Sequence, residues 1–196
     1  MCVIVVKKQD KKFPGMETLK NCWNKNPDGA GFMFAKDGLV HIRKGFMDWA
    51  SFWSELTECR DLYGDLIPYV VHFRIATHGK VSPQCCHPFP LSNSLDDMRV
   101  LEFDTPTGIA HNGVIPNRTT NDSVSDTMDY ISSFVYPLSE ICDDWATDVK
   151  ARLNTSQNVT APKPNVAHEH AVVGLNTSQN VTAPKHYLSS RVLFSV

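Results

Sequence analysis

Tyr69-Val-Val-His-Phe-Arg-Ile-Ala76 is a run of β-branched and aromatic residues, which is the composition of a strand inside a sheet. The opening stretch Met1-Cys-Val-Ile-Val-Val6 has the same character and is about one strand long. Between these two runs, Asp37-Gly38 separates short apolar segments at 31–35 and 39–43. Because Asp-Gly suits a tight turn, these segments are expected to pair as a hairpin. The first half of the chain therefore predicts a sheet.

Helical patterns flank these strands. Residues 16–23 form one short candidate, which ends at the breaker cluster of residues 24–29. A second helix is expected from Asp48 to Leu62, because Asp48 is a suitable N-cap and aromatic residues follow at helical spacing. Residues 108–115 read as another short strand, and residues 123–126 open a further helix to about residue 139. Strands in two groups with helices beside them predict a mixed α+β protein and not a βαβ array.

Length, charge and hydropathy exclude several classes of protein. A chain of 196 residues with 42% hydrophobic residues can build a core, and its formal net charge of −2 gives no reason to expect nucleic acid as a partner. No stretch approaches the ~20 apolar residues that span a bilayer. The positive charges follow the first apolar run instead of preceding it, so that run is not a signal peptide. We therefore expect a cytoplasmic protein with no membrane contact, whose six cysteines are reduced thiols.

The last part of the chain has a different composition. Residues 2–150 are expected to form one domain, and residues 151–196 an atypical tail. Within that tail, the 11-residue segment at 153–163 recurs without change at 175–185. The segment is polar, contains Pro and has no periodicity, so both copies are predicted to be loops. Residues 190–196 have the composition of a last strand.

Cys2 is the first candidate for chemistry. Removal of Met1 would leave a residue that carries a thiol and a free amine on the same carbon. An α-amino group has a pKa near ~7.7–8.0, so it can act as the general base for the thiol at neutral pH. The alternative is an inert, small buried residue at the start of a strand, which is the commoner situation for cysteine.

Three further positions each have a chemical and a structural interpretation. Arg74 at a strand end can bind a carboxylate through two parallel N–H bonds, or it can be a solvated side chain. Asn112 and Gly113 supply the donor types of an oxyanion hole, or they form a hairpin turn. Asp126 places a carboxylate at a helix start, where it could bind a cation or act as an N-cap.

His72, Cys85, Cys86 and His87 are residue types that bind metal ions. Adjacent cysteines cannot easily both bind one zinc ion, because tetrahedral sites normally use a C-x₂₋₄-C spacing. We therefore expect neither a metal nor another cofactor.

Taken together and in order, these pieces resemble the class II glutamine amidotransferase domain, one branch of the N-terminal nucleophile (Ntn) hydrolases. The resemblance covers about residues 2–140 and is closest to small stand-alone members of bacteria and their phages. It rests on Cys2 and on five motifs: Asn26-Pro-Asp-Gly-Ala-Gly-Phe32, His72-Phe-Arg-Ile-Ala-Thr-His-Gly79, Cys86-His-Pro-Phe89, Ile109-Ala-His-Asn-Gly-Val114 and Ser125-Asp-Thr127. The fold that it implies is a four-layer αββα sandwich.

The resemblance also implies a reaction and a role for each residue. Cys2 would attack the side-chain amide of glutamine to form a γ-glutamyl thioester, while its own α-amino group takes and returns the proton. Asn112 and Gly113 would hold the oxyanion. The residues that would bind or surround glutamine are Arg74 for its α-carboxylate, Asp126 for its α-ammonium group, and Thr77, His78, Gly79 and His87 as lining of the pocket.

The released ammonia would serve a separate synthase or acceptor-binding protein. Two other functions remain open at this point. One is an Ntn amidohydrolase that uses Cys2 on a different amide, and the other is a non-catalytic interaction module that keeps the fold.

Overall fold

The computed structural model describes residues 2–76, 80–115, 123–149 and 171–176. Its larger sheet has five antiparallel strands in the order β1-β4-β2-β3-β6. The two strongest strand patterns in the sequence therefore lie side by side, with Val3 opposite Phe73 and Lys7 opposite Tyr69. The strands of this sheet are β1 (Val3–Lys7), β2 (Ala30–Lys36), β3 (Leu39–Phe46), β4 (Tyr69–Phe73) and β6 (Glu102–Thr105).

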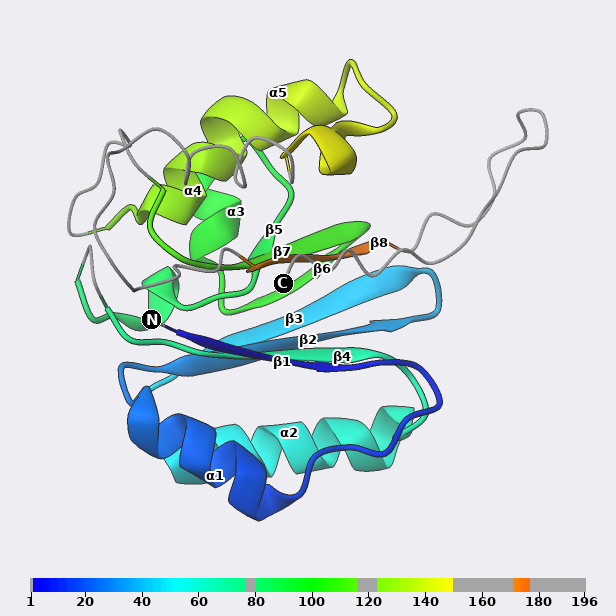
Figure 1. The fold of residues 1–196 in the computed structure, drawn as a ribbon, viewed down its shortest axis with the longest axis vertical. Helices are drawn as coiled ribbons and strands as arrows, with labels where there is room; N and C mark the ends of the chain where they lie inside the picture. Colours follow the sequence, from blue (N-terminus) through cyan, green and yellow to red (C-terminus); the bar gives the residue numbers. More distant parts are fainter. Residues whose placement is uncertain (1, 77–79, 116–122, 150–170, 177–196) are drawn as a thin grey trace, which may run out of the picture.

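A second, three-stranded sheet faces the first one (Figure 1). Its order is β5-β7-β8, and both pairs are antiparallel. The strands are β5 (Phe89–Pro90), β7 (Thr107–Asn112) and β8 (Ala171–Asn176). β7 is the central strand, and its last residue is Asn112, so this candidate oxyanion donor lies at the end of the central strand of the smaller sheet.

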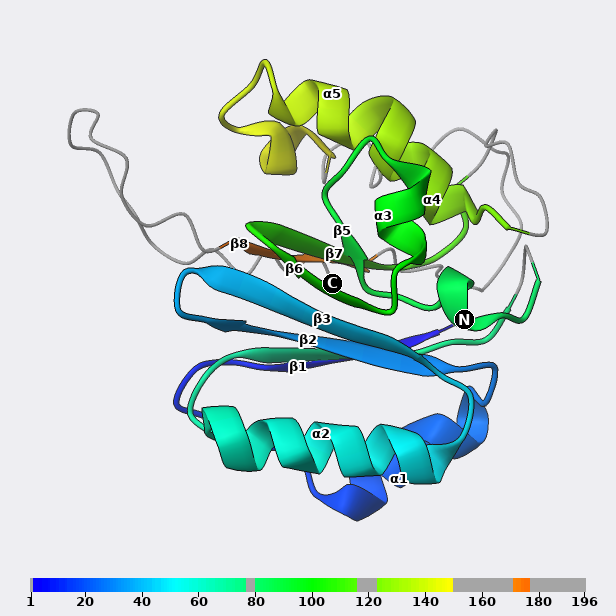
Figure 2. The ribbon, with the colours of Figure 1, turned by 180° about the vertical axis from the view of Figure 1, so that it is seen from behind.

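Helices cover the outer face of each sheet (Figures 1 and 2). α1 (Met16–Lys25) and α2 (Trp49–Tyr63) pack on the larger sheet. On the far side of the smaller sheet lie α3 (Leu95–Arg99), α4 (Asp126–Tyr130), the π-helical turn η2 (Ile131–Val135) and α5 (Tyr136–Ser139). A short 3₁₀ turn, η1 (Pro83–Cys85), precedes β5. The molecule is thus a mixed α and β protein with antiparallel sheets, as the sequence predicted.

The alternation of side chains along the strands divides the core into three parts. Aromatic residues of β2 and β4 face α1 and α2, whereas their neighbours face the second sheet. The layer between the sheets contains Met33, Val40, Ile42, Val70 and Ala110. A third cluster lies between β7 and the helices above it, and includes Ile109, Met128, Ile131 and Val135. Successive residues along a strand therefore pack into different layers of the core.

Several local predictions can be compared with the structure. The Asp37-Gly38 hairpin is confirmed, since β2 pairs with β3 across it. The N-cap prediction is also confirmed, because the Asp48 carboxylate accepts the Ser51 amide at 2.9 Å. The tail prediction was wrong at 175–176, where the expected loop is the end of β8. The proposed strand at 190–196 lies outside the described residues. No helix in the described part of the chain is long and apolar enough to cross a membrane.

Candidate functional site

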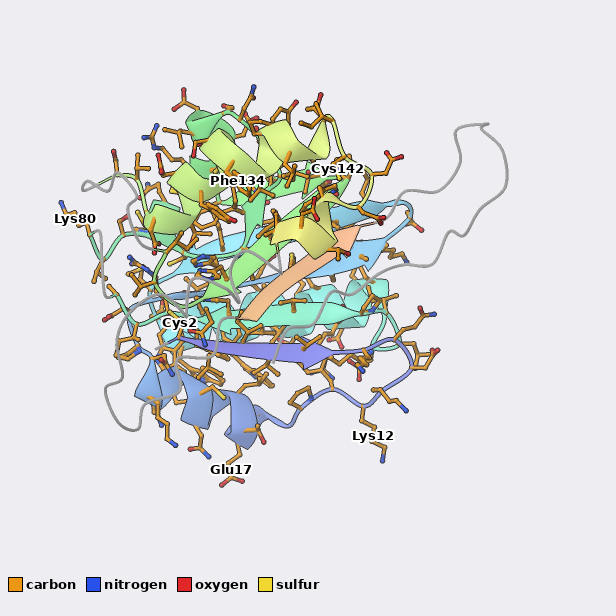
Figure 3. The ribbon with its side chains drawn as sticks, turned by 45° about the horizontal axis from the view of Figure 1, so that its top comes forward. Cys2, Lys12, Glu17, Lys80, Phe134 and Cys142 are labelled. Atoms are coloured by element: carbon orange, nitrogen blue, oxygen red, sulfur yellow. The ribbon has the colours of Figure 1, made fainter. Side chains whose placement is uncertain are left out.

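Cys2 lies at the N-terminal end of β1, at the opposite end of this strand from Lys12 (Figure 3). Ile4 and Val6 of the same strand pack into the layer between the two sheets. Because side chains alternate along a strand, Cys2 is directed to this same side. β1 also lies against β7 across the two sheets. The thiol is therefore placed at one end of the inter-sheet layer.

The backbone of Ile75 holds the Cys2 thiol. The Ile75 amide donates to Sγ at 3.4 Å, and the thiol donates to the Ile75 carbonyl oxygen at 3.5 Å. Burial raises the pKa of Cys2, whereas the hydrogen bond to Ile75 and the charge of Arg74 lower it and the charge of Asp126 raises it. Burial is the largest of these effects, so the thiol stays protonated at neutral pH. A nucleophile at this position needs a nearby base.

The segment that holds the thiol is itself tied to the loop after α1. The Asp28 amide donates to the Arg74 carbonyl at 3.1 Å, and the Arg74 amide donates to the Gly29 carbonyl at 2.8 Å. In addition, the Asp28 carboxylate accepts the Ala76 amide at 2.8 Å. Sequence reasoning gave Asp28 no role of its own, although it lies in one of the motifs that carry the family resemblance. Its acidic side chain in a Pro-Asp-Gly turn is the signal that could have identified it.

Arg74 directly follows β4 and is only 4% exposed. Its Nη1 donates to the backbone carbonyl of Lys80 at 3.1 Å, so the guanidinium lies beside Lys80. The solvated-side-chain interpretation of Arg74 is therefore wrong. Thr77, His78 and Gly79 lie outside the described residues.

β7 ends at Asn112, and Gly113 follows it directly. Ala110 of β7 faces the inter-sheet layer, so Asn112, two residues later, is directed to that layer as well. The Oδ1 atom of Asn112 is buried and has no hydrogen-bond partner within the described residues. Gly113 has φ of 138°, a conformation that favours glycine.

Asp126 is the first residue of α4 and not its N-cap. The cap is Ser125, whose hydroxyl accepts the Met128 amide at 3.2 Å. Asp126 instead accepts the Ile115 amide at 2.8 Å and its neighbouring Thr127 amide at 2.8 Å. The carboxylate thereby joins the helix start to the segment after Gly113.

His87 is buried in the layer between the sheets, where its ring stacks on His72 at a centroid distance of 4.3 Å. Neither ring nitrogen of His87 has a hydrogen-bond partner in the part of the chain that the structure describes. Burial lowers the pKa of His72 to about 3 and holds that of His87 well below its usual value. Both imidazoles are therefore neutral at physiological pH.

Lys44 was not identified from the sequence. Its ammonium group is buried, donates to the carbonyls of Gln84 (3.1 Å) and Met98, and lies 4.0 Å from the ring centre of Phe89. Burial lowers the pKa of Lys44 to about 7. Lys44 connects β3 to the segments around β5, including the one that carries His87. Its place in the alternation of β3, two residues after the buried Ile42, could have identified it as inward-facing.

All six cysteines are free thiols. Cys85 and Cys86, which raised the question of zinc, are both buried, and burial raises the pKa of Cys86 to about 11. Among the described residues there is no group of three or more His, Cys, Asp or Glu side chains that could hold a metal ion.

Comparison of the chain with models of known protein families gives no match, and comparison with curated proteins gives none either. The assignment of a function therefore rests on the site itself. That site combines a half-buried thiol, a buried guanidinium, a carboxylate and a strand end with amide donors.

Proposed function

We propose that this chain is a class II glutamine amidotransferase domain, which uses Cys2 to hydrolyse the side-chain amide of glutamine and release ammonia. The observation that carries the proposal is the convergence of separate chain segments on the Cys2 thiol. Ile75 hydrogen-bonds the thiol, and the charges of Arg74 and Asp126 both act on it. A zwitterionic substrate needs one cation and one anion, and these two residues supply them.

We further propose that the fold is the four-layer αββα sandwich of the Ntn hydrolases. Its support is the arrangement in which α1 and α2, the larger sheet, the smaller sheet and the α3–α5 region follow one another (Figures 1 and 2). In such a sandwich, a nucleophile at the start of a central-layer strand opens onto the edge between the sheets. Cys2 directly precedes β1, which is an edge strand of the larger sheet.

The reaction begins when Cys2 Sγ attacks Cδ of the glutamine side chain, and the thiol proton passes to the α-amino group that removal of Met1 exposes. The carbonyl oxygen becomes an oxyanion, which the Asn112 side-chain amide and the Gly113 backbone amide stabilise. Loss of one such donor typically reduces the rate by ~10²–10³. The C–N bond then breaks, the amine returns its proton to the leaving nitrogen, and ammonia departs from a γ-glutamyl thioester.

Water completes the cycle. The α-amino group takes a proton from the water molecule, which attacks the thioester carbonyl, and the C–S bond breaks. The thiolate regains its proton and glutamate leaves. Because burial raises the pKa of Cys2, the thiol has no spontaneous thiolate to use, and an adjacent base is required at neutral pH.

Substrate binding divides among the remaining residues. Arg74 binds the α-carboxylate and Asp126 the α-ammonium group, while Thr77, His78 and Gly79 line the pocket. His87 also lines the pocket. The ammonia serves a synthase or acceptor-binding protein on another chain.

A steady-state assay of glutamate and ammonia production from glutamine tests this function, with Cys2→Ala as the matched control. The proposal predicts equal amounts of both products from the wild-type protein and none from the variant. Activity on other amides with none on glutamine would instead select another Ntn amidohydrolase. Absence of both activities, in a protein that has lost Met1, would indicate a non-catalytic module.

A further inference from the structure

His72 forms a hydrogen bond from one sheet to the other, beside the proposed nucleophile and the proposed oxyanion donors. It lies within β4, opposite Ile4 of β1 and Gly31 of β2, and is completely buried. Its Nε2 lies 3.2 Å from the carbonyl oxygen of His111 in β7. His111 immediately precedes Asn112.

The chemistry of this contact determines the protonation of the ring. A carbonyl oxygen only accepts, so Nε2 carries the hydrogen and Nδ1 is the bare nitrogen. Burial lowers the pKa of His72 to about 3, so the ring is neutral and this tautomer persists at physiological pH. Nδ1 has no partner within the described residues.

His111 continues this connection on the other face of β7. Its Nδ1 lies 3.4 Å from the hydroxyl of Thr127, the neighbour of Asp126. On the β4 side, His72 lies two residues before Arg74, and the next residue, Ile75, hydrogen-bonds Cys2. A buried polar chain thus runs from the strand that fixes the nucleophile, through β7, to the helix that carries Asp126.

We propose that His72 is a positioning residue, whose Nε2–H group fixes the end of β7 and thereby sets Asn112 and Gly113 relative to Cys2. The inference rests on the proposed function, since it assigns these two residues to the oxyanion. The hydrophobic cluster between the sheets contains Met33, Val70 and Ala110. Apolar burial is non-directional, whereas a hydrogen bond has a required distance and angle. His72 therefore supplies a directional contact between the two sheets.

Two substitutions separate the hydrogen bond from the volume of the ring. His72→Gln can place an amide N–H near the position of Nε2, whereas His72→Leu has a similar size and no donor. Each variant is assayed for kcat and KM with glutamine, and separately for alkylation of Cys2 by iodoacetamide. Alkylation requires the thiol but no oxyanion, so it reports on Cys2 alone.

We expect His72→Leu to lower kcat by roughly 10- to 100-fold. This decrease is no larger than the one that follows removal of an oxyanion donor itself. KM and the rate of alkylation should change little, and His72→Gln should recover much of the lost kcat. If alkylation falls in parallel with kcat, or if His72→Gln is as impaired as His72→Leu, the ring only supports the fold and the proposal is wrong. Should His72→Leu not fold, His72→Asn replaces it, because its shorter amide cannot reach the carbonyl.

A second readout separates failure of this proposal from failure of the proposed function. The backbone amide resonances of Asn112 and Gly113 can be followed by NMR whether or not the protein hydrolyses glutamine. If the His72 hydrogen bond fixes the end of β7 (the structural link), these resonances shift in His72→Leu and stay near their wild-type positions in His72→Gln. An inactive wild-type protein with this pattern would refute glutamine hydrolysis and keep the link. An active protein whose resonances are the same in all three forms would refute the link.

Discussion

Lowering the pH below about 6.5 should destabilise the folded protein, because two buried imidazoles resist protonation. His72 and His87 stack on each other in the layer between the sheets. Burial lowers the pKa of His72 to about 3 and that of His87 well below its usual value, and the positive charge of Arg74 acts in the same direction on both. In the unfolded chain both rings regain an ordinary pKa near 6.5. The unfolded state therefore binds protons that the folded state cannot bind.

The size of the effect follows from these pKa values. For one histidine, the free energy of unfolding decreases by about 1.4 kcal/mol per pH unit once the pH is below about 6.5. Between about pH 7.5 and 5, this amounts to about 2 kcal/mol for each ring and about 4 kcal/mol for the pair. Natural domains have a total stability of about 5–15 kcal/mol, so the predicted loss is easily measured.

Urea denaturation followed by tryptophan fluorescence, repeated at several pH values in this range, measures the effect. His72→Gln is the matched variant, because it removes one of the two titrating rings and should reduce the pH dependence by about half. Two other buried groups also titrate. Lys44, with a pKa of about 7, adds a smaller change of the same sign near the upper end of this range, about 1 kcal/mol, which is common to the wild-type protein and the variant. Cys86, with a pKa of about 11, changes stability only above the ordinary pKa of a thiol. A free energy of unfolding that is constant over this range, or a variant with the wild-type pH dependence, would refute the reasoning.

Three further predictions concern single side chains. Gly31→Ala should lower the free energy of unfolding by about 1–3 kcal/mol, because the new Cβ would overlap the carbonyl oxygen of His87. A Cβ at Gly15 meets no atom within 4 Å, so Gly15→Ala is the control that should not lower it, and thermal unfolding compares the two variants. Asp28→Ala should lower the free energy of unfolding by about 1–3 kcal/mol, because it removes the acceptor for the Ala76 backbone amide. Asp28→Asn keeps an acceptor oxygen and should lower it less. Urea denaturation measures both variants, and equal losses of stability would contradict the role of this hydrogen bond. Arg74→Lys should raise KM for glutamine by roughly tenfold, since lysine cannot bind a carboxylate in two parallel bonds; an unchanged KM in initial-rate assays would remove Arg74 from the substrate site.

Local features of the fold could be predicted from the sequence because their causes are local. β4 and the β2–β3 hairpin follow from composition and from Asp37-Gly38, and the start of α2 follows from its N-cap. β8 was not predicted, although most of its residues are apolar, because its pairing with β7 joins segments that are far apart in the sequence. Its first residue pairs with Asn112, so a long-range contact extends β7 to the candidate site.

The candidate site shows the same division. The types and order of Cys2, Arg74, Asn112 and Asp126 carry the proposed chemistry, since each side chain matches one part of a zwitterionic substrate or its reaction. The groups that surround them depend on packing between the sheets, and sequence patterns do not contain that information. A buried histidine such as His72 looks the same in a sequence as an exposed one until the pairing of its strand is known.

Intact mass of the purified protein, with and without the glutamine analogue 6-diazo-5-oxo-norleucine, tests the central claim most directly. The account predicts loss of Met1 and one covalent adduct, which is absent in Cys2→Ala. A protein that retains Met1 and forms no adduct would contradict it, because the thiol would then have neither its base nor its substrate.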